Sequence, residues 1–152
     1  MMKMANFQDI LNKNADDIHP PPVLPEGSYH SVLMGLPEQG ESSKKKTPQL
    51  KFTHKIIAPL DDVDPDHIAE FEAEGETIAG QEVENIHYVT HKTENMIKEF
   101  LINCGIDMAG KSLAEGIDET PNSEVIVFMK HEQSDDGKRT YSKVRYTAKI
   151  PD

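Results

Sequence analysis

Residues 49–58 read QLKFTHKIIA, and apolar and cationic side chains alternate along them. Leu50 and Phe52 fall at positions that alternate with those of Lys51 and Lys55. Side chains of a β-strand point to opposite faces in turn, so this pattern predicts a strand with one buried face and one solvent face. The solvent face of this strand is basic.

Four other segments have the composition of strands, because β-branched and aromatic residues are frequent in them and turn residues flank them. They are residues 27–36 (GSYHSVLMGL), 81–90 (QEVENIHYVT), 124–131 (EVIVFMKH) and 139–150 (RTYSKVRYTAKI). The last two are separated by SDDGK at 134–138, a turn sequence that predicts a hairpin. Residues 38–48 (EQGESSKKKTP) are polar and rich in turn formers, which predicts a loop.

One helix is indicated between the third and fourth strands. Thr93 is a suitable cap, Gly105 a suitable end, and the apolar positions between them follow helical spacing. These positions are Met96, Ile97, Phe100, Leu101 and Cys104. A shorter surface helix is predicted from Asp64 and Pro65, a cap and first-turn pair, to Gly75. Residues 105–122 are expected to form a loop with one turn near Leu113.

The chain divides into an N-terminal arm with a proline linker, residues 1–26, and a single domain, residues 27–152. The linker contains Pro20, Pro21, Pro22 and Pro25, which favour extended structure. A total of 152 residues suits one hydrophobic core.

Charge is distributed unevenly along the chain. The formal net charge is -11, which disfavours binding of polyanions by the surface as a whole. Residues 60–84 contain ten acids and no Lys or Arg, which leaves 17 of the 27 acids against 16 bases elsewhere. Residues 42–58 contain five lysines and no acid. Screening over about 8 Å at physiological salt lets such a basic segment attract phosphate despite a distant acidic one.

Several other classes of protein are disfavoured by the sequence. The single Cys104 excludes an internal disulfide and a multi-cysteine zinc site. His87 and His91 straddle a predicted strand end, so they are not expected to form a pair of metal ligands. Pro65 interrupts an acidic run that would otherwise resemble a calcium loop. No metal or other cofactor is therefore expected. No known catalytic motif is present, which favours a protein that is not an enzyme. Without an apolar run of about 18 residues, or a signal-like segment at Met1 to Ala5, we expect a soluble cytoplasmic protein that does not enter membranes.

The order of elements predicts a mainly β fold, a five-stranded barrel of OB-fold type. One helix lies between strands 3 and 4, and the acidic segment is an insertion between strands 2 and 3. Closure into a barrel removes the open edges of so small a sheet, and the helix covers one end. In the OB-fold, loops 1-2 and 4-5 border the ligand face.

The chain resembles phage-encoded single-stranded-DNA-binding proteins of OB type. The resemblance runs from about Pro25 to Ala148, through PEGSYHSVLMGLPEQGESSKKKTPQLKF, HKTENMIKEFLINCGIDMAGKSL and EVIVFMKHEQSDDGKRTYSKV. It implies a small protein that coats single strands during phage replication or recombination, in the cytoplasm of the host cell. The acidic C-terminal tail of many such proteins is missing here, so the acidic segment is the candidate for recruiting replication or recombination proteins.

Binding of single-stranded DNA with little sequence preference needs cations for phosphates and aromatic faces for bases. The candidate residues for this role are Lys44, Lys45, Lys46, Lys51, Lys55, Tyr88, Lys138, Arg139, Tyr141, Lys143 and Arg145. Tyr29 and Phe52 are further candidates for stacking. A core position is favoured for Phe52, Phe128 and Tyr146, and both positions stay open for Tyr29, Tyr88 and Tyr141.

A second hypothesis is a protein-interaction or assembly module that binds no nucleic acid. In that case the acidic segment and the N-terminal arm are the contact surfaces, and the net charge is the relevant clue. Assembly into a homo-oligomer is compatible with both hypotheses.

Overall fold

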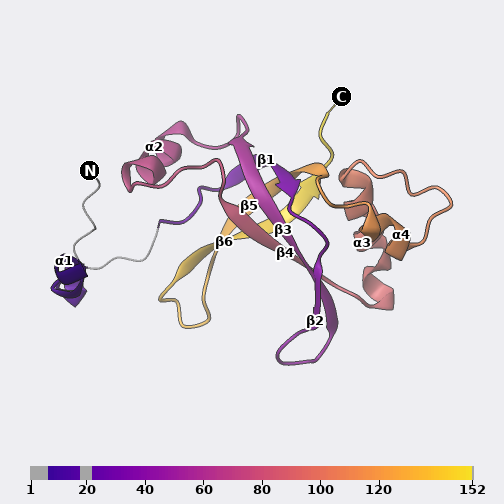
Figure 1. Cartoon of the computed structure of the whole chain (residues 1–152), viewed down its shortest axis with the longest axis horizontal. Helices are drawn as coiled ribbons and strands as arrows, with labels where there is room; N and C mark the ends of the chain where they lie inside the picture. The colour runs from indigo at the N-terminus through magenta and orange to yellow at the C-terminus, as the bar shows by residue number, and fades with distance from the viewer. Residues whose placement is uncertain (1–6, 18–21, 152) are drawn as a thin grey trace.

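The computed structural model describes residues 7–17 and 22–151, and within them one antiparallel sheet carries most of the structure (Figure 1). Its strands are β1 (Gly27–Leu33), β2 (Glu38–Glu41), β3 (Pro48–Pro59), β4 (Glu82–Tyr88), β5 (Glu124–Gln133) and β6 (Thr140–Ala148). The α-helices are α1 (Phe7–Leu11), α2 (Pro65–Ala73), α3 (Glu94–Asn103) and α4 (Leu113–Asp118). Two 3-10 turns, Ala15–Asp17 and His91–Thr93, complete the set.

The sheet has six strands and is open. β1 lies between β3 and β5, β6 pairs with β5, and β3 also pairs with β2 and β4. Cα atoms of β4 and β6 approach to within 8 Å of each other, but no backbone pairing joins these strands in the described part of the chain. The expected closed barrel of five strands is therefore corrected to an open mixed α/β arrangement.

The additional strand is β2, which lies in the segment expected to be a loop. All four of its residues are exposed, and it pairs with residues 48–51 through the backbone ladder, beside which Glu38 forms an ion pair with Lys51. A strand without a buried face has no apolar alternation, so the sequence pattern could not reveal it.

The alternation predicted for residues 49–58 is confirmed in β3. Leu50, Phe52, His54 and Ile56 are buried, while Lys51 is only partly covered and Lys55 is exposed. The same alternation places Asn85 and His87 on the inner side of β4. The outer face of these two strands carries Lys and Glu side chains together with the exposed Ile57 and Ile86.

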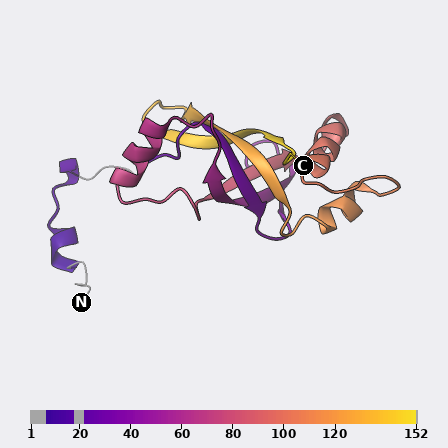
Figure 2. The same ribbon diagram turned by 90° about the horizontal axis from the view of Figure 1, so that it is seen from above.

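Two apolar clusters fill the interior, one at each end of the sheet. The first packs Phe71 of α2 against Tyr29 and Ile56, and the second packs Phe100 and Leu101 of α3 with neighbouring strand residues. Figures 1 and 2 show α2 at one end of the sheet and α3 with α4 at the other. The two helical layers thus cover opposite ends of one sheet.

Both predicted helices are present. Asp64 caps α2 by accepting a hydrogen bond from the Asp66 backbone nitrogen (2.9 Å), and Gly75 follows this helix with φ +90. α3 buries three of the five expected apolar positions within its bounds and Cys104 at its C-cap. Met96, which helical spacing places in the same apolar stripe, is 62% exposed, so the stripe is wider than the buried face of the helix.

Helix α4 lies where only a turn near Leu113 was expected. Ser112 accepts from the Glu115 backbone nitrogen and Glu115 accepts from the Ser112 backbone nitrogen, both at 3.1 Å. This reciprocal capping stabilises a short helix start that the sequence signature Ser-x-x-Glu already contained.

The end of the proline linker packs onto the sheet. Leu24 is buried, and the Tyr29 hydroxyl donates to the Pro25 carbonyl (2.6 Å). α1 has no buried residue. The expectations for Met1 to Ala5 and for Pro20 and Pro21 lie outside the described residues. The division of the chain at residue 26 stays a prediction.

Gly27 provides a test of the contact between β1 and the segment that leads into α2. Its φ is +134, and a Cβ built on it would lie 2.6 Å from Val63 Cγ2 and 3.0 Å from the Val63 Cα. We expect Gly27→Ala to lower the free energy of unfolding by about 2–4 kcal/mol, because backbone strain adds to overpacking. Gly40→Ala is the matched control, since nothing lies within 4 Å and its φ is ordinary. Equal chemical-denaturation midpoints for the two variants would contradict this packing.

Candidate nucleic-acid interface

The hairpin between β2 and β3 presents the predicted lysine cluster. Its turn is closed by bonds from the Ser42 nitrogen to the Thr47 carbonyl (2.8 Å) and from the Lys46 nitrogen to the Ser42 carbonyl (3.1 Å). Lys46 adopts φ 55, a left-handed conformation that completes the turn. Lys44, Lys45 and Lys46 are all exposed, and no ion pair engages them within the residues described. The hairpin therefore keeps its positive charge.

The hairpin between β5 and β6 presents Lys138 and Arg139 in a different electrostatic setting. Asp136 accepts hydrogen bonds from the Ser134 hydroxyl (2.5 Å) and the Lys138 backbone nitrogen (3.0 Å), which lowers the pKa of its carboxyl. Asp135 lies in the same turn. Two acids thus balance the two bases, so this turn attracts phosphate less than the other hairpin does.

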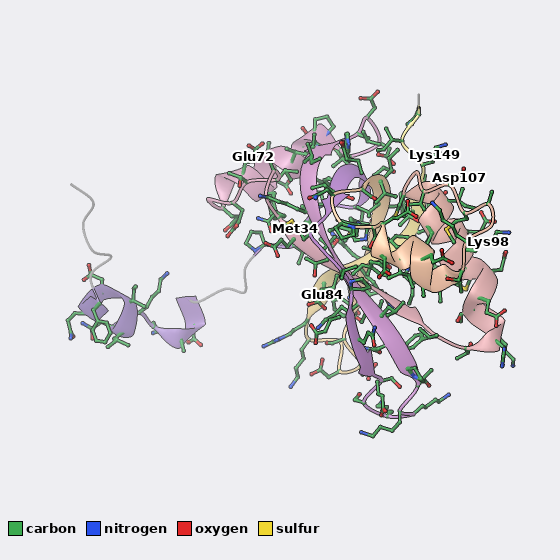
Figure 3. The ribbon with its side chains drawn as sticks, turned by 45° about the vertical axis from the view of Figure 1, so that its right-hand side comes forward. Met34, Glu72, Glu84, Lys98, Asp107 and Lys149 are labelled. Carbon is green, nitrogen blue, oxygen red and sulfur yellow. The ribbon has the colours of Figure 1, made fainter. Side chains whose placement is uncertain are left out.

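The two hairpins project toward the same end of the molecule. Figure 1 shows both at the lower side of the sheet, and Figure 3, turned about the vertical axis, shows the same arrangement. The acidic helix α2 lies toward the upper side in both views, where Figure 3 labels Glu72. The lysine hairpin and the acidic helix α2 thus lie at opposite ends of β3.

Tyr88 joins the lysine hairpin at a surface hollow of about 520 Å³. The hollow is lined by Ser42, Ser43, Lys44, Lys45, Thr47, Tyr88 and Thr90. Tyr88 is 48% exposed at the end of β4. Two predicted cations and one predicted stacking residue, about 40 positions apart in sequence, therefore lie at one site.

The strand lysines are compensated more fully than the sequence suggested. Lys51 Nζ lies 3.8 Å from Glu38 Oε2 and 3.9 Å from Glu84 Oε1. Lys55 is exposed, but its direct partner across the ladder is Glu82. The outer face of β3 and β4 is thus mixed in charge, because the acids of β4 alternate onto the same side.

On β6 the prediction is correct for some residues and wrong for others. Tyr141 is 45% exposed, and both Lys143 and Arg145 are exposed as expected. Lys143 Nζ forms an ion pair with Glu132 Oε2 at 3.3 Å. Tyr146, expected in the core, is 57% exposed, and Phe128 is only half-buried beside it.

The sequence left the position of Tyr29 open and favoured the core for Phe52. Tyr29 and Phe52 are fully buried, so neither can stack on a base, and burial raises the pKa of the Tyr29 hydroxyl.

Lys130 was not singled out in the sequence, although it lies directly across the ladder from Lys143. Strand pairing is the information needed to find it, and a single sequence does not supply it.

The acidic segment has structural as well as surface roles. Asp62 accepts hydrogen bonds from the backbone nitrogen (2.9 Å) and hydroxyl (2.8 Å) of Ser28. Val63, Phe71 and Ile78 fix the segment in the core. The carboxylates on α2 itself are exposed.

A buried Ser-His-Asn chain crosses the interior. With the Asn85 amide donating to His54 Nε2 (3.4 Å), His54 Nδ1–H donates to Ser31 Oγ (3.2 Å), and this hydroxyl donates to the Val125 carbonyl (2.7 Å). Ser31 and His54 have no exposed surface. A substrate cannot reach this hydroxyl, so the chain of bonds is structural.

The other residues considered for chemistry are also separated or buried. His87 packs against Phe100 with ring centroids 4.6 Å apart, whereas His91 is fully exposed and contacts Glu94. Burial raises the pKa of the Cys104 thiol to about 12. Across residues 7–17 and 22–151, no group of three His, Cys, Asp or Glu side chains is arranged to hold a metal.

Neither a known family model nor a curated protein sequence matches this chain. In the part of the chain that the structure covers, none of the helices has both the length and the apolar character to cross a membrane.

The buried His54 predicts a pH dependence of stability. Desolvation lowers its pKa from 6.5 to about 4, so the unfolded chain binds a proton there more readily than the folded one. Its stabilising contribution is present above pH 6.5 and is lost as pH falls toward 4. We expect about 2 kcal/mol less unfolding free energy from this group at pH 5 than at pH 7. His54→Gln, which does not titrate, should show a shallower decline in urea titrations; parallel curves would refute the assignment.

Proposed function

We propose that this protein binds single-stranded DNA with little sequence preference and without catalysing a reaction. The observation that carries the proposal is the hollow in which Lys44 and Lys45 meet Tyr88. Cations without carboxylate partners attract phosphates, and an exposed tyrosine offers a face to a base. A ligand without fixed sequence needs these two elements and no base-specific pocket.

We further propose that the sheet is an open form of the OB arrangement. β1 and β2 together follow one path along β3, α3 lies between β4 and β5, and β6 follows by a hairpin. On this assignment the β2–β3 and β5–β6 hairpins correspond to loops 1-2 and 4-5, which border the ligand face of the OB-fold. Their projection toward one end of the molecule supports the assignment (Figure 1).

The net charge of -11 is compatible with this function because of where the acids lie. The exposed carboxylates of α2 lie at the opposite end of β3 from the lysine hairpin (Figure 3). Screening over about 8 Å at physiological salt separates the two fields. By the resemblance described above, the proposed setting is phage DNA replication or recombination in the host cytoplasm.

A charge reversal at the hairpin tests the proposal. We expect Lys44→Glu with Lys45→Glu to weaken binding to a labelled oligothymidylate at least about tenfold at low salt, and to reduce the salt slope by about 1.4. The readout is fluorescence anisotropy over a series of salt concentrations.

The matched control is Lys98→Glu with Lys149→Glu, which changes the net charge equally at exposed positions away from the hairpins (Figure 3). This control should alter affinity by less than about threefold, since both side chains lie away from the two hairpins and solvent screens exposed charges. Undetectable binding of the wild-type protein at low salt would end the proposal, as would equal losses in the two variants.

The second candidate function is a protein-interaction module, and the exposed carboxylates of α2 favour it. Because Val63, Phe71 and Ile78 belong to the core, deleting the segment would unfold the protein. Neutralisation by Glu70→Gln, Glu72→Gln and Glu74→Gln leaves these anchors in place.

If this segment recruits replication or recombination proteins, the neutralised variant should lose a partner that co-purifies with the wild-type protein. Its affinity for oligothymidylate should stay within about twofold, because solvent screens the distant charges. Retention of the same partner by the variant contradicts a recruiting role. Tighter DNA binding would instead mean that the segment competes with DNA for the lysine hairpin.

A further inference from the structure

The outer face of β5 and β6 carries three successive cross-strand pairs. From the hairpin inward they are Glu132 with Tyr141, Lys130 with Lys143, and Phe128 with Tyr146. Met129, between Phe128 and Lys130, is fully buried, which places its two neighbours on the outer side. On this face β6 therefore presents an aromatic, a cationic and an aromatic side chain, namely Tyr141, Lys143 and Tyr146.

A β-bulge produces this order. The register shifts between Phe128 and Met129, so that Val144 faces Met129 and Tyr146 faces Phe128, with Arg145 as the additional residue. An additional residue reverses the alternation of the strand beyond it. Val144 consequently remains in the core, while Tyr146 turns outward.

The Phe128 and Tyr146 rings form a parallel stack. Their centroids are 4.7 Å apart and their planes differ by 5°. More than half of Tyr146 is nonetheless exposed, so the stack fixes the orientation of the ring without enclosing it. A ring held flat on one side and exposed elsewhere is suited to receive another planar group.

Positive charge is concentrated beside this stack. Lys130 and Lys143 face each other directly, an arrangement of like charges that destabilises a sheet. Together with Arg145 they line a hollow of about 430 Å³, and the one carboxylate there is Glu132. Glu132 pairs with Lys143, whereas Lys130 and Arg145 have no ion pair among the residues described. An anion in the hollow would relieve the repulsion.

We propose that this face is a nucleotide-binding subsite, in which a base stacks on Tyr146 and its phosphate contacts Lys130, Lys143 and Arg145. The inference rests on the proposed binding of single-stranded DNA and adds a position for one nucleotide of the strand. It extends the interface from the lysine hairpin to β5 and β6, and it assigns roles to Phe128, Lys130 and Tyr146.

Affinity for two ligands separates stacking on Tyr146 from a purely structural role. Tyr146→Ala should weaken binding of oligothymidylate about 5- to 150-fold, the range for one lost base stack. An abasic oligomer with the same phosphate backbone should bind the wild-type protein more weakly, and Tyr146→Ala should leave that affinity unchanged. Equal weakening for both oligomers would overturn the assignment, because a structural defect does not depend on the presence of a base.

Tyrosine emission gives a second readout, because the chain contains no Trp and four Tyr. Tyr146→Phe preserves a stacking ring, so affinity should stay near the wild-type value while the quenching of emission by oligothymidylate becomes smaller. Unchanged quenching would place the stacked base elsewhere. Lys130→Gln should reduce the salt slope by about 0.7, the value for one phosphate contact on a single strand.

The subsite and the proposed function fail in different ways. If the wild-type protein binds no oligonucleotide at low salt, both fail. If it binds, and only the Lys44 and Lys45 variant is impaired, the function stands and the subsite is refuted. Saturation by thymidine monophosphate at concentrations at which oligothymidylate binds would show a free-nucleotide site and overturn the role in strand binding.

Discussion

A buried polar layer, formed by Ser31, His54 and Asn85, constrains the register of β1, β3, β4 and β5. It lies between the two apolar clusters, since Ile56 and Phe52 flank His54 on β3 and belong to different clusters. Its hydrogen bonds run through β1, β3, β4 and the Val125 carbonyl of β5. A buried polar group without a partner costs about 1–3 kcal/mol, so a change of register in any of these strands is penalised. The layer thereby specifies which side of these four strands faces solvent.

The proposed interface depends on that specification. A slip of β3 by one residue would turn Lys51 and Lys55 inward and expose Phe52, because side chains alternate strictly. The same constraint sets the outward direction of Tyr88 on β4. Burial lowers the pKa of His54 and so keeps its ring neutral, and a neutral ring can both accept from Asn85 and donate to Ser31.

Local patterns in the sequence were sufficient to predict features that a few neighbouring residues determine. The alternation in β3, the Asp64 cap of α2 and the glycine after α3 were all predictable, since each depends on its immediate neighbours. Pairing between distant strands was not predictable in this way. It accounts for β2, for the open sheet and for the like-charged pair of Lys130 and Lys143.

The bulge in β6 shows why the candidate site was predicted only in part. Simple alternation from Tyr141 places Lys143 outward correctly, but it assigns Tyr146 to the core because it has no means of registering an additional residue. The position of a bulge depends on the partner strand, here on Phe128 and Met129 of β5. Lysines of the hairpin needed no such information, because a turn between strands is exposed whatever the register.

The open edges of β4 and β6 link stability to the proposed function. An exposed strand edge invites pairing with another chain, and charged side chains are a common protection. β6 exposes Lys143 and Arg145. The Asn103 amide donates to the Thr147 carbonyl (3.3 Å) and so provides a partner for one backbone oxygen of β6. Cations that discourage pairing with a second strand of protein still attract a polyanion. The phosphates of the DNA strand proposed as ligand need no backbone ladder, so charges that protect this edge from another β-strand are compatible with the proposed function.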